Sequence, residues 1–334
     1  MYYKFFLISP TNDLFMKFSL LKITIITLLF FSCCSDRSLF TDPNDPGLGG
    51  AFTIISGEIS GTLPKSKSPY YVSENITVPA ETTLSIEPGT LIFFKSNAGF
   101  YISGGLRAVG TKELPIIFQG FGNAWEGIHS ENPTDSLIFI FCDIVEVYLP
   151  IGSDSKYGGV EISNSKLVMK NCYFNYNYAQ NGGALAISYC SSEIMNCIFY
   201  DNESLDYGGA ILSQNSSNKI INNTFYKNFC LNFGGALTIV DPVYEEIQNN
   251  IFFDNFSYRG DPRLHLVSGD STNVFEQYNF LAPDSLNPLF KSPTDFHLQE
   301  NSPCKDAGNP SPEFNDADGS QNNQGAYGGP GGDW

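Results

Sequence analysis

One short segment combines the residue types that acid–base catalysis uses. Arg259, Asp261, Arg263 and His265 stand at alternate positions of the chain. A carboxylate and an imidazole can move protons, and a guanidinium group can bind the negative charge of a substrate. The segment lies where an internal repeat loses its glycine pair, so a degenerate repeat with solvated charges also explains it. We favour this second explanation and keep Asp261, Arg263 and His265 as the catalytic candidates.

Two carboxylates near the C-terminus could hold a cation. In Asp316-Ala317-Asp318-Gly319 the alternate carboxylates can point at one Ca²⁺ ion. No Glu follows at the position that an EF-hand requires, and a polar turn is the competing interpretation. We favour the polar turn, so the sequence gives no firm cofactor, and calcium at Asp316 and Asp318 is kept as the one candidate.

The charge of the chain excludes one large class of partners. Its 334 residues include 18 Lys and Arg against 35 Asp and Glu, which gives a net charge of -17. A nucleic-acid-binding protein needs a basic face that displaces counterions, and the sequence has none. An anionic membrane surface would repel the chain, so we expect membrane contact only through a lipid anchor.

The N-terminus indicates export. A basic stretch at Met16-Lys17 precedes an apolar run that ends at Phe31 and is followed by Ser32-Cys33-Cys34. The run is shorter than the roughly 20 residues that span a bilayer, and the pattern predicts a signal peptide over residues 1–34. A small residue before Cys resembles the lipobox of bacterial lipoproteins, which implies lipidation at Cys33 or Cys34. Residues 35–50 form a flexible linker, and we expect an outer-membrane, cell-surface or secreted protein.

The composition and an internal repeat predict the fold. Charged residues make up only 16% of the chain, which has 31 Gly and 28 Phe, and this favours an all-β protein with many turns. Four motifs recur at steps of 24 to 27 residues. They give a first asparagine column (Asn171, Asn196, Asn222, Asn249), a phenylalanine column (Phe174, Phe199, Phe225, Phe252), a second asparagine column (Asn177, Asn202, Asn228, Asn255) and glycine pairs (Gly158-Gly159, Gly182-Gly183, Gly208-Gly209, Gly234-Gly235).

The spacing inside each repeat predicts bent coils. An apolar residue stands five places before each Phe, as Met169 does before Phe174. Five is odd, so a straight strand would put the two on opposite faces, whereas a bend between them lets both face one core. Asn tolerates the left-handed conformation of a tight bend, and Gly supplies further positions of positive φ. We therefore expect stacked coils of short parallel strands, with a core stack of Phe rings and an amide ladder.

Cysteines occupy equivalent positions in successive coils. Cys142, Cys172 and Cys197 each lie two places before an apolar core position of the coil. Neighbours about 4.8 Å apart could form a disulfide in an oxidising compartment. A buried column of free thiols is the alternative, and we favour it.

These motifs carry a resemblance to a known family. Phe-x-x-Asn and Gly-Gly-Ala-Ile/Leu alternate over residues 155–260, as in Phe199 to Asn202 and Gly208 to Ile211. This resembles the polymorphic outer-membrane protein repeats of bacterial surface proteins, and it implies a right-handed parallel β-helix of the pectate-lyase-like type. Thr83–Phe93 is similar to the entry coils of such proteins, and residues 301–334 are similar to their closing segment. We expect the β-helix over residues 51–300, with roughly ten coils at about 25 residues each.

Two kinds of function fit such a scaffold. The first is a non-catalytic protein of the cell envelope or surface, which binds a glycan or a protein, mediates adhesion or serves as structure. The second is a polysaccharide lyase or glycoside hydrolase, a hypothesis that rests on the fold alone. A hydrolase needs two placed carboxylates, and no such pair stands out within the repeats. We expect the first function.

Overall fold

The computed structural model describes residues 52–122, 125–149, 158–281 and 286–334. The predicted signal peptide, the lipidation at Cys33 or Cys34 and the linker lie outside these described residues. Within the described ranges, no helix is long and apolar enough to cross a membrane.

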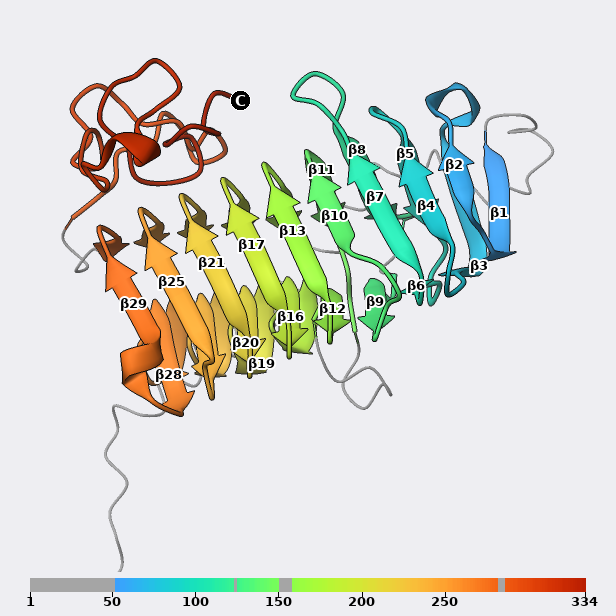
Figure 1. Ribbon diagram of the computed structural model, residues 1–334, viewed down its shortest axis with the longest axis horizontal. Helices are drawn as coiled ribbons and strands as arrows, with labels where there is room; N and C mark the ends of the chain where they lie inside the picture. The colour runs from blue at the N-terminus through green and yellow to red at the C-terminus, as the bar shows by residue number, and fades with distance from the viewer. Residues whose placement is uncertain (1–51, 123–124, 150–157, 282–285) are drawn as a thin grey trace, which may run out of the picture. The chain divides into compact units, whose positions relative to one another are not determined.

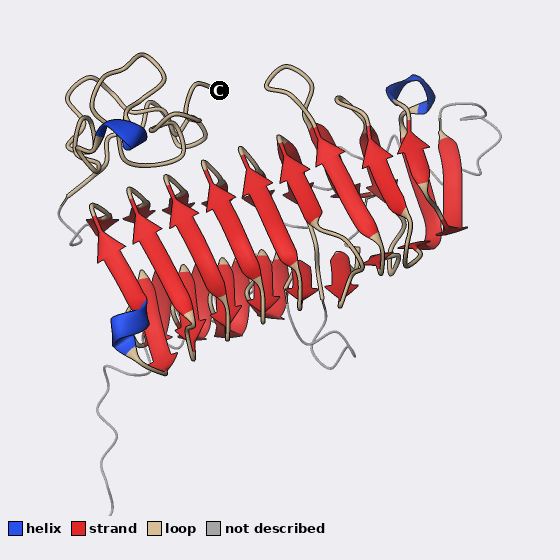
Figure 2. Cartoon of the chain, viewed as in Figure 1, coloured by secondary structure: helices blue, strands red, loops and turns tan. Residues whose placement is uncertain are grey.

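The described chain is a right-handed parallel β-helix of about eight turns, so the predicted fold class is confirmed (Figures 1 and 2). Equivalent short strands of successive coils pair in parallel and form three sheets. The first sheet has nine strands: β2 (Gly61–Leu63), β4 (Thr83–Ile86), β7 (Gly105–Val109), β10 (Leu137–Ile140), β13 (Lys166–Lys170), β17 (Ser191–Met195), β21 (Ser217–Ile221), β25 (Tyr244–Gln248) and β29 (Val274–Gln277).

The second sheet joins two columns of strands, because β1 (Thr53–Glu58) and β3 (Tyr70–Val78) contribute to both. One column continues through β5 (Leu91–Phe94), β8 (Ile116–Gly120), β11 (Cys142–Val145), β14 (Tyr173–Asn175), β18 (Ile198–Tyr200), β22 (Thr224–Tyr226), β26 (Ile251–Phe253) and β30 (Phe280–Leu281). The other continues through β6 (Phe100–Ile102), β9 (Ile128–Glu131), β12 (Val160–Ser163), β16 (Leu185–Ser188), β20 (Ile211–Gln214), β24 (Leu237–Val240) and β28 (Leu264–Ser268).

The third sheet is confined to the later coils and contains β15 (Tyr178–Asn181), β19 (Glu203–Tyr207), β23 (Phe229–Phe233) and β27 (Phe256–Arg259). Three short 3-10 helices, η3 (Lys65–Lys67), η4 (Ser271–Asn273) and η5 (Pro312–Phe314), complete the secondary structure of the described residues.

Each later coil turns at four corners, and each corner has a residue with positive φ. In the coil that starts at β13 these residues are Asn171, Tyr176, Gly182 and Tyr189, with φ of 54°, 54°, 55° and 53°. The first asparagine column and the first glycine of each pair occupy two of the corners, where the left-handed region costs Asn and Gly least. The other two corners also hold residues that rarely adopt this conformation.

The phenylalanine column fills the core between the sheets. Its four rings are at most 1% exposed. Phe199 stacks on Phe174 at a centroid distance of 4.8 Å and on Phe225 at 4.9 Å, and Phe225 stacks on Phe252 at 4.7 Å. These separations match the distance between paired strands, so strand pairing itself places the rings in contact.

The second asparagine column forms a hydrogen-bonded ladder inside the corner. Asn202 Nδ2 donates to Asn228 Oδ1 at 3.0 Å and to the Phe174 carbonyl at 3.0 Å. Asn202 Oδ1 accepts from the backbone N–H and from Nδ2 of Asn177. Every polar atom of this buried amide is thus used, which removes the cost of burying it.

The stack ends at Leu281, earlier than residue 300, and the expected count of roughly ten coils is too high. Paired positions in β7, β10 and β13 are Leu106, Leu137 and Leu167, so these two coils have 31 and 30 residues instead of about 25. Residues 286–334, the closing segment, form no strand.

The first asparagine column binds the closing segment along the side of the coils. Its Nδ2 groups donate to carbonyl oxygens, from Asn171 to Gly331 (2.8 Å), from Asn196 to Gly328 (2.7 Å) and from Asn222 to Asn323 (2.9 Å). Phe290 and Phe296 of the closing segment pack edge-on against Tyr226, with centroids 5.7 Å apart in each case. A column that we interpreted as turn residues therefore also anchors the end of the chain.

Candidate functional site

The outer face of the third sheet carries a continuous row of large side chains. Strand pairing places Tyr148, Tyr178, Glu203, Phe229 and Phe256 at equivalent positions of five successive coils. We call these residues the outer row. Their neighbours along the strands, such as Ala179 and Cys230, are buried, so strand alternation turns the outer row toward solvent.

The rings of the outer row stack in two pairs. Tyr148 and Tyr178 lie 4.9 Å apart at an interplanar angle of 16°, and Phe229 and Phe256 lie 5.8 Å apart at 4°. Tyr258 meets the edge of Phe256 at 5.3 Å. Tyr148, Phe256 and Tyr258 are 48%, 51% and 48% exposed. Tyr178 and Phe229 between them are partly exposed, and the outer row is thus the candidate binding surface.

A polar row runs beside the rings. Asp206 accepts a hydrogen bond from Gln180 at 2.9 Å through one carboxylate oxygen and from Asn232 at 3.0 Å through the other. The three side chains come from β15, β19 and β23 and are partly exposed. These hydrogen bonds hold the three planar polar groups in one row. Their other donors and acceptors can form hydrogen bonds with a ligand that stacks on the rings.

Glu203 is the one ionisable carboxyl in the outer row. Burial, followed by the negative charge of Asp201, raises the pKa of Glu203 to about 7. Burial, then Tyr148 and Glu203, raises the pKa of the neighbouring Tyr178 to about 12. At neutral pH the row therefore offers a carboxyl that is partly protonated and a phenol that stays protonated.

A second line of rings borders the same sheet and contains one of the catalytic candidates. Tyr207 stacks on Phe233 at 5.9 Å, and Phe233 stacks on His265 at 5.1 Å. The Arg259 guanidinium lies 6.0 Å from the centre of the Phe233 ring, in cation–π geometry. His265 and Arg259 thus both contact the Phe233 ring, and the sequence analysis predicts neither contact.

Asp261 and Arg263 pair with each other instead of forming an acid–base unit with His265. Arg263 Nη2 lies 2.7 Å from Asp261 Oδ2, its Nε donates to Asp261 Oδ1 at 2.9 Å, and its Nη1 donates to the Leu281 carbonyl at 3.2 Å. Burial acts to raise the pKa of Asp261, but the hydrogen bonds and charge of Arg263 hold it below its usual value. The pair links the segment after β27 to β30 through the Leu281 carbonyl.

Both calcium candidates accept hydrogen bonds within the closing segment. Asp316 Oδ1 accepts from the backbone N–H groups of Asn323 at 3.0 Å and Gly329 at 2.6 Å. Asp318 is exposed, and its Oδ1 accepts from the N–H and hydroxyl of Ser320. Among the described residues no group of three His, Cys, Asp or Glu could hold a metal ion. Asp316 thus holds two backbone N–H groups of the closing segment, and Asp318 bonds within a local turn, as the interpretation by a polar turn expects.

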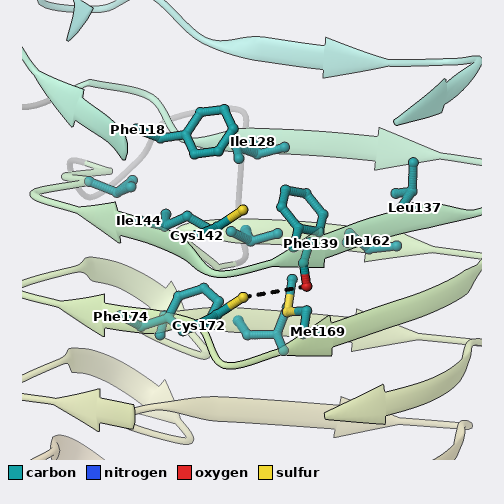
Figure 3. Packing of buried hydrophobic residues seen from close by; sticks show 14 of the residues in the cluster. Phe118, Ile128, Leu137, Phe139, Cys142, Ile144, Ile162, Met169, Cys172 and Phe174 are labelled. Atoms are coloured by element: carbon teal, nitrogen blue, oxygen red, sulfur yellow. Dashed lines mark hydrogen bonds between the residues drawn. The ribbon is translucent and has the colours of Figure 1, made fainter. Parts of the chain in front are cut away.

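The cysteine column is buried in the core (Figure 3). Cys142, Cys172 and Cys197 are free thiols and are 0% exposed. The Cys172 thiol donates to the Phe139 carbonyl at 3.4 Å, and the Cys197 thiol donates to the Met195 carbonyl at 3.3 Å. The next coils have Asn223 and Asn250 at this position, and these bond to each other through their amides at 3.0 Å.

His129 has partners that the sequence does not place near it. Its Nδ1 lies 3.2 Å from Glu161 Oε2, its Nε2 lies 2.7 Å from the Glu126 carbonyl, and its ring stacks on Tyr101 at 5.2 Å. Both ring nitrogens are engaged and the residue is 8% exposed, so His129 links its own coil to the coils before and after it. The partners come from different coils, and no local motif signals them.

One signal could have revealed the outer row. Tyr178, Glu203, Phe229 and Phe256 each directly follow a residue of the second asparagine column. The Phe-x-x-Asn motif ends at this asparagine, so the motif itself assigns no function to the residue that follows.

The fold and the comparisons with known proteins agree on the class of protein. The family model "Right handed beta helix region" matches residues 121–280, which cover the later coils and the outer row. A stretch of 62 residues, 19% of this chain, is 42% identical to Protein bark beetle of Drosophila melanogaster, and the chain spans only 2% of that protein. No solved structure matches the chain. These findings support a right-handed parallel β-helix as the fold of the described residues.

Proposed function

We propose that this chain is a non-catalytic protein of the cell envelope that binds a neutral glycan on the outer face of the third sheet. The observation that carries the proposal is the outer row, with the polar row beside it. Sugar rings present C–H faces that stack on aromatic rings and hydroxyl groups that bond planar polar side chains. A coil spacing of about 4.8 Å is close to the length of one sugar unit, so a linear glycan fits across the coils.

Charge favours a neutral glycan over an acidic one. Asp201, Glu203 and Asp206 all belong to β19 or the corner before it, and the chain has a net charge of -17. Carboxylates on the ligand would face these groups without a row of cations to offset them. Among the described residues, Arg259 is the one cation in cation–π contact with a ring of the third sheet, that of Phe233.

Binding should depend on the rings of the outer row. We expect Phe256→Ala to weaken binding of a neutral oligosaccharide by about tenfold, since truncation of a contacting aromatic side chain can cost about 1.4 kcal/mol or more. A glycan array should identify the oligosaccharide, and calorimetry should give the affinities. Phe275→Ala is the matched control, because Phe275 is 47% exposed and belongs to β29 of the first sheet. Equal affinities for the two variants would refute the assignment of the face.

A glycoside hydrolase is the second candidate, and Glu203 is the observation in its favour. A general acid of this reaction needs a raised pKa and a second carboxylate nearby. Asp201 and Asp206 are the nearest acids along the chain. Release of reducing ends from neutral polysaccharides, abolished by Glu203→Gln, would replace the binding proposal with this one.

The proposed location at the cell envelope rests on the signal peptide and the lipobox-like segment Ser32-Cys33-Cys34. We expect labelled palmitate to enter the chain in a bacterial host and to be absent from a Cys33→Ala/Cys34→Ala variant. Equal labelling of both, or none of either, would refute the lipid anchor. The binding proposal does not depend on this result.

A further inference from the structure

We propose that Glu203 is the specificity-determining residue of the outer row, where its neutral carboxylic acid donates a hydrogen bond to an oxygen of a neutral glycan and its ionised form disfavours binding. The inference rests on the proposed function. It goes beyond that function because it names the residue that contacts the glycan and the protonation state in which this residue binds.

The position of Glu203 carries the argument. Its strand pairs with β15 and β23, and the side chain stands between Tyr178 and Phe229 in the row. A glycan stacked on both ring pairs must pass over this carboxyl, since no other residue occupies the third of the five positions. The site therefore has one carboxyl among the rings, and that carboxyl faces the middle of the ligand.

The groups around Glu203 do not stabilise its charge. From β15 the titratable neighbour is Tyr178, and from β19 itself the neighbours are Asp206 and Tyr207. The corner before β19 contributes Asp201, whose charge acts on Glu203 and on Lys227. The outward residues of β23 are Phe229, Leu231, Asn232 and Phe233, none of which ionises. The corner before β23 contributes the cation Lys227, whose charge acts on Asp201 and Asp254, whereas Asp201 is the one charge that acts on Glu203.

A bound glycan would increase the preference for the neutral form. The ligand removes water from a carboxyl that is already half-buried, and an ionised carboxylate pays more for this loss than a protonated one. The protonated form also donates a hydrogen bond, and sugar hydroxyl oxygens accept one. By linkage, a complex that prefers the proton binds with constant affinity below the pKa of free Glu203, about 7, and loses affinity above it.

The test is a pH series with named probes, cellohexaose and laminarihexaose. The wild-type affinity should stay level up to about pH 6.5 and fall by up to about tenfold per pH unit above pH 7. Calorimetry at about pH 8 in two buffers of different ionisation enthalpy should show uptake of a proton on binding. Glu203→Gln should keep the low-pH affinity and lose both effects, because its amide donates at every pH.

Three outcomes separate the two proposals. Glu193→Gln, on β17 of the first sheet, is the control and should leave the wild-type pH profile unchanged. A level profile for the wild type together with loss of binding in Phe256→Ala would overturn the role of Glu203 and leave the binding face intact. No binding of either probe by the wild type at any pH, with no hit on the array, would overturn both. Circular dichroism and thermal melting of each variant should show that the coils are folded.

Discussion

Phe225→Ala should lower the free energy of unfolding by about 3–5 kcal/mol, the usual cost of removing a buried Phe side chain. Phe225 is 0% exposed and contacts rings in the coils on both sides, at 4.9 and 4.7 Å. The truncation leaves a cavity that rigid parallel strands cannot close, because their spacing is set by backbone hydrogen bonds. Denaturant unfolding followed by circular dichroism measures the change.

Phe275→Ala is the control for this measurement. Phe275 is 47% exposed, and exposed changes usually stay within about 1 kcal/mol. A loss for Phe225→Ala no greater than that of the control would show that the phenylalanine column is not the core of these coils.

The second large effect concerns a carboxylic acid inside the coils. Glu245 is 0% exposed, and its Oε1 accepts hydrogen bonds from Ser213 at 2.5 Å and from Asn218 at 2.8 Å. Burial raises the pKa of Glu245 to about 8, although these two hydrogen bonds act to lower it. The native protein therefore holds a proton on Glu245 at neutral pH, whereas the unfolded chain does not.

The stability should therefore fall as pH rises. The contribution of Glu245 is fully present below about pH 4.5, the pKa of an unfolded Glu, and is lost as pH approaches 8. A shift of this size corresponds to a few kcal/mol, on the order of 1.4 kcal/mol per pKa unit. Raised pKa values of about 7 for Asp143 and Glu203 act in the same direction.

The Glu245→Gln variant removes the pH-dependent contribution of Glu245 to the free energy of unfolding. Unfolding free energies of the wild type and the variant should converge below about pH 4.5. They should separate in favour of the variant between about pH 4.5 and 8 and differ by a constant amount above that. Parallel curves for the two proteins across this range would show that Glu245 does not carry the proton. Glu193→Gln at the surface should leave the curve of the wild type unchanged.

The repeating features of the fold could be predicted, because each one recurs at the coil spacing. The phenylalanine column, the asparagine bends and the glycine pairs need particular residue types, so their period is visible in the sequence. The corners at Tyr176, Asp201 and Lys227 have positive φ as well. They follow no residue preference, and the flanking strands impose their conformation. The fourth corner holds Asn215, Asp241 and Gly269 in the later coils, so residue types locate three corners of these coils and leave the second hidden.

The candidate site was hidden for a related reason. Glu203 stands alone among aromatic residues, and its neighbours in space are about 25 residues away in the chain. Glu245 likewise occupies an inward position that holds Leu in earlier coils, such as Leu167. A residue that differs from the repeat pattern once, such as Glu203 or Glu245, cannot be placed on a face of the coil until the strand register is known. The chemical cluster that the sequence did show, at Asp261 and Arg263, was a structural pair.

The attachment of the closing segment limits how this protein can change length. A stack of coils can gain or lose one whole coil without altering the pairing on either side. Here, however, Asn171, Asn196 and Asn222 bind carbonyl groups of one continuous closing segment. Duplication of a coil between these asparagines would move their partners about 4.8 Å out of line, whereas duplication before β10 would not. Relatives of this chain should thus vary in length mainly among the N-terminal coils.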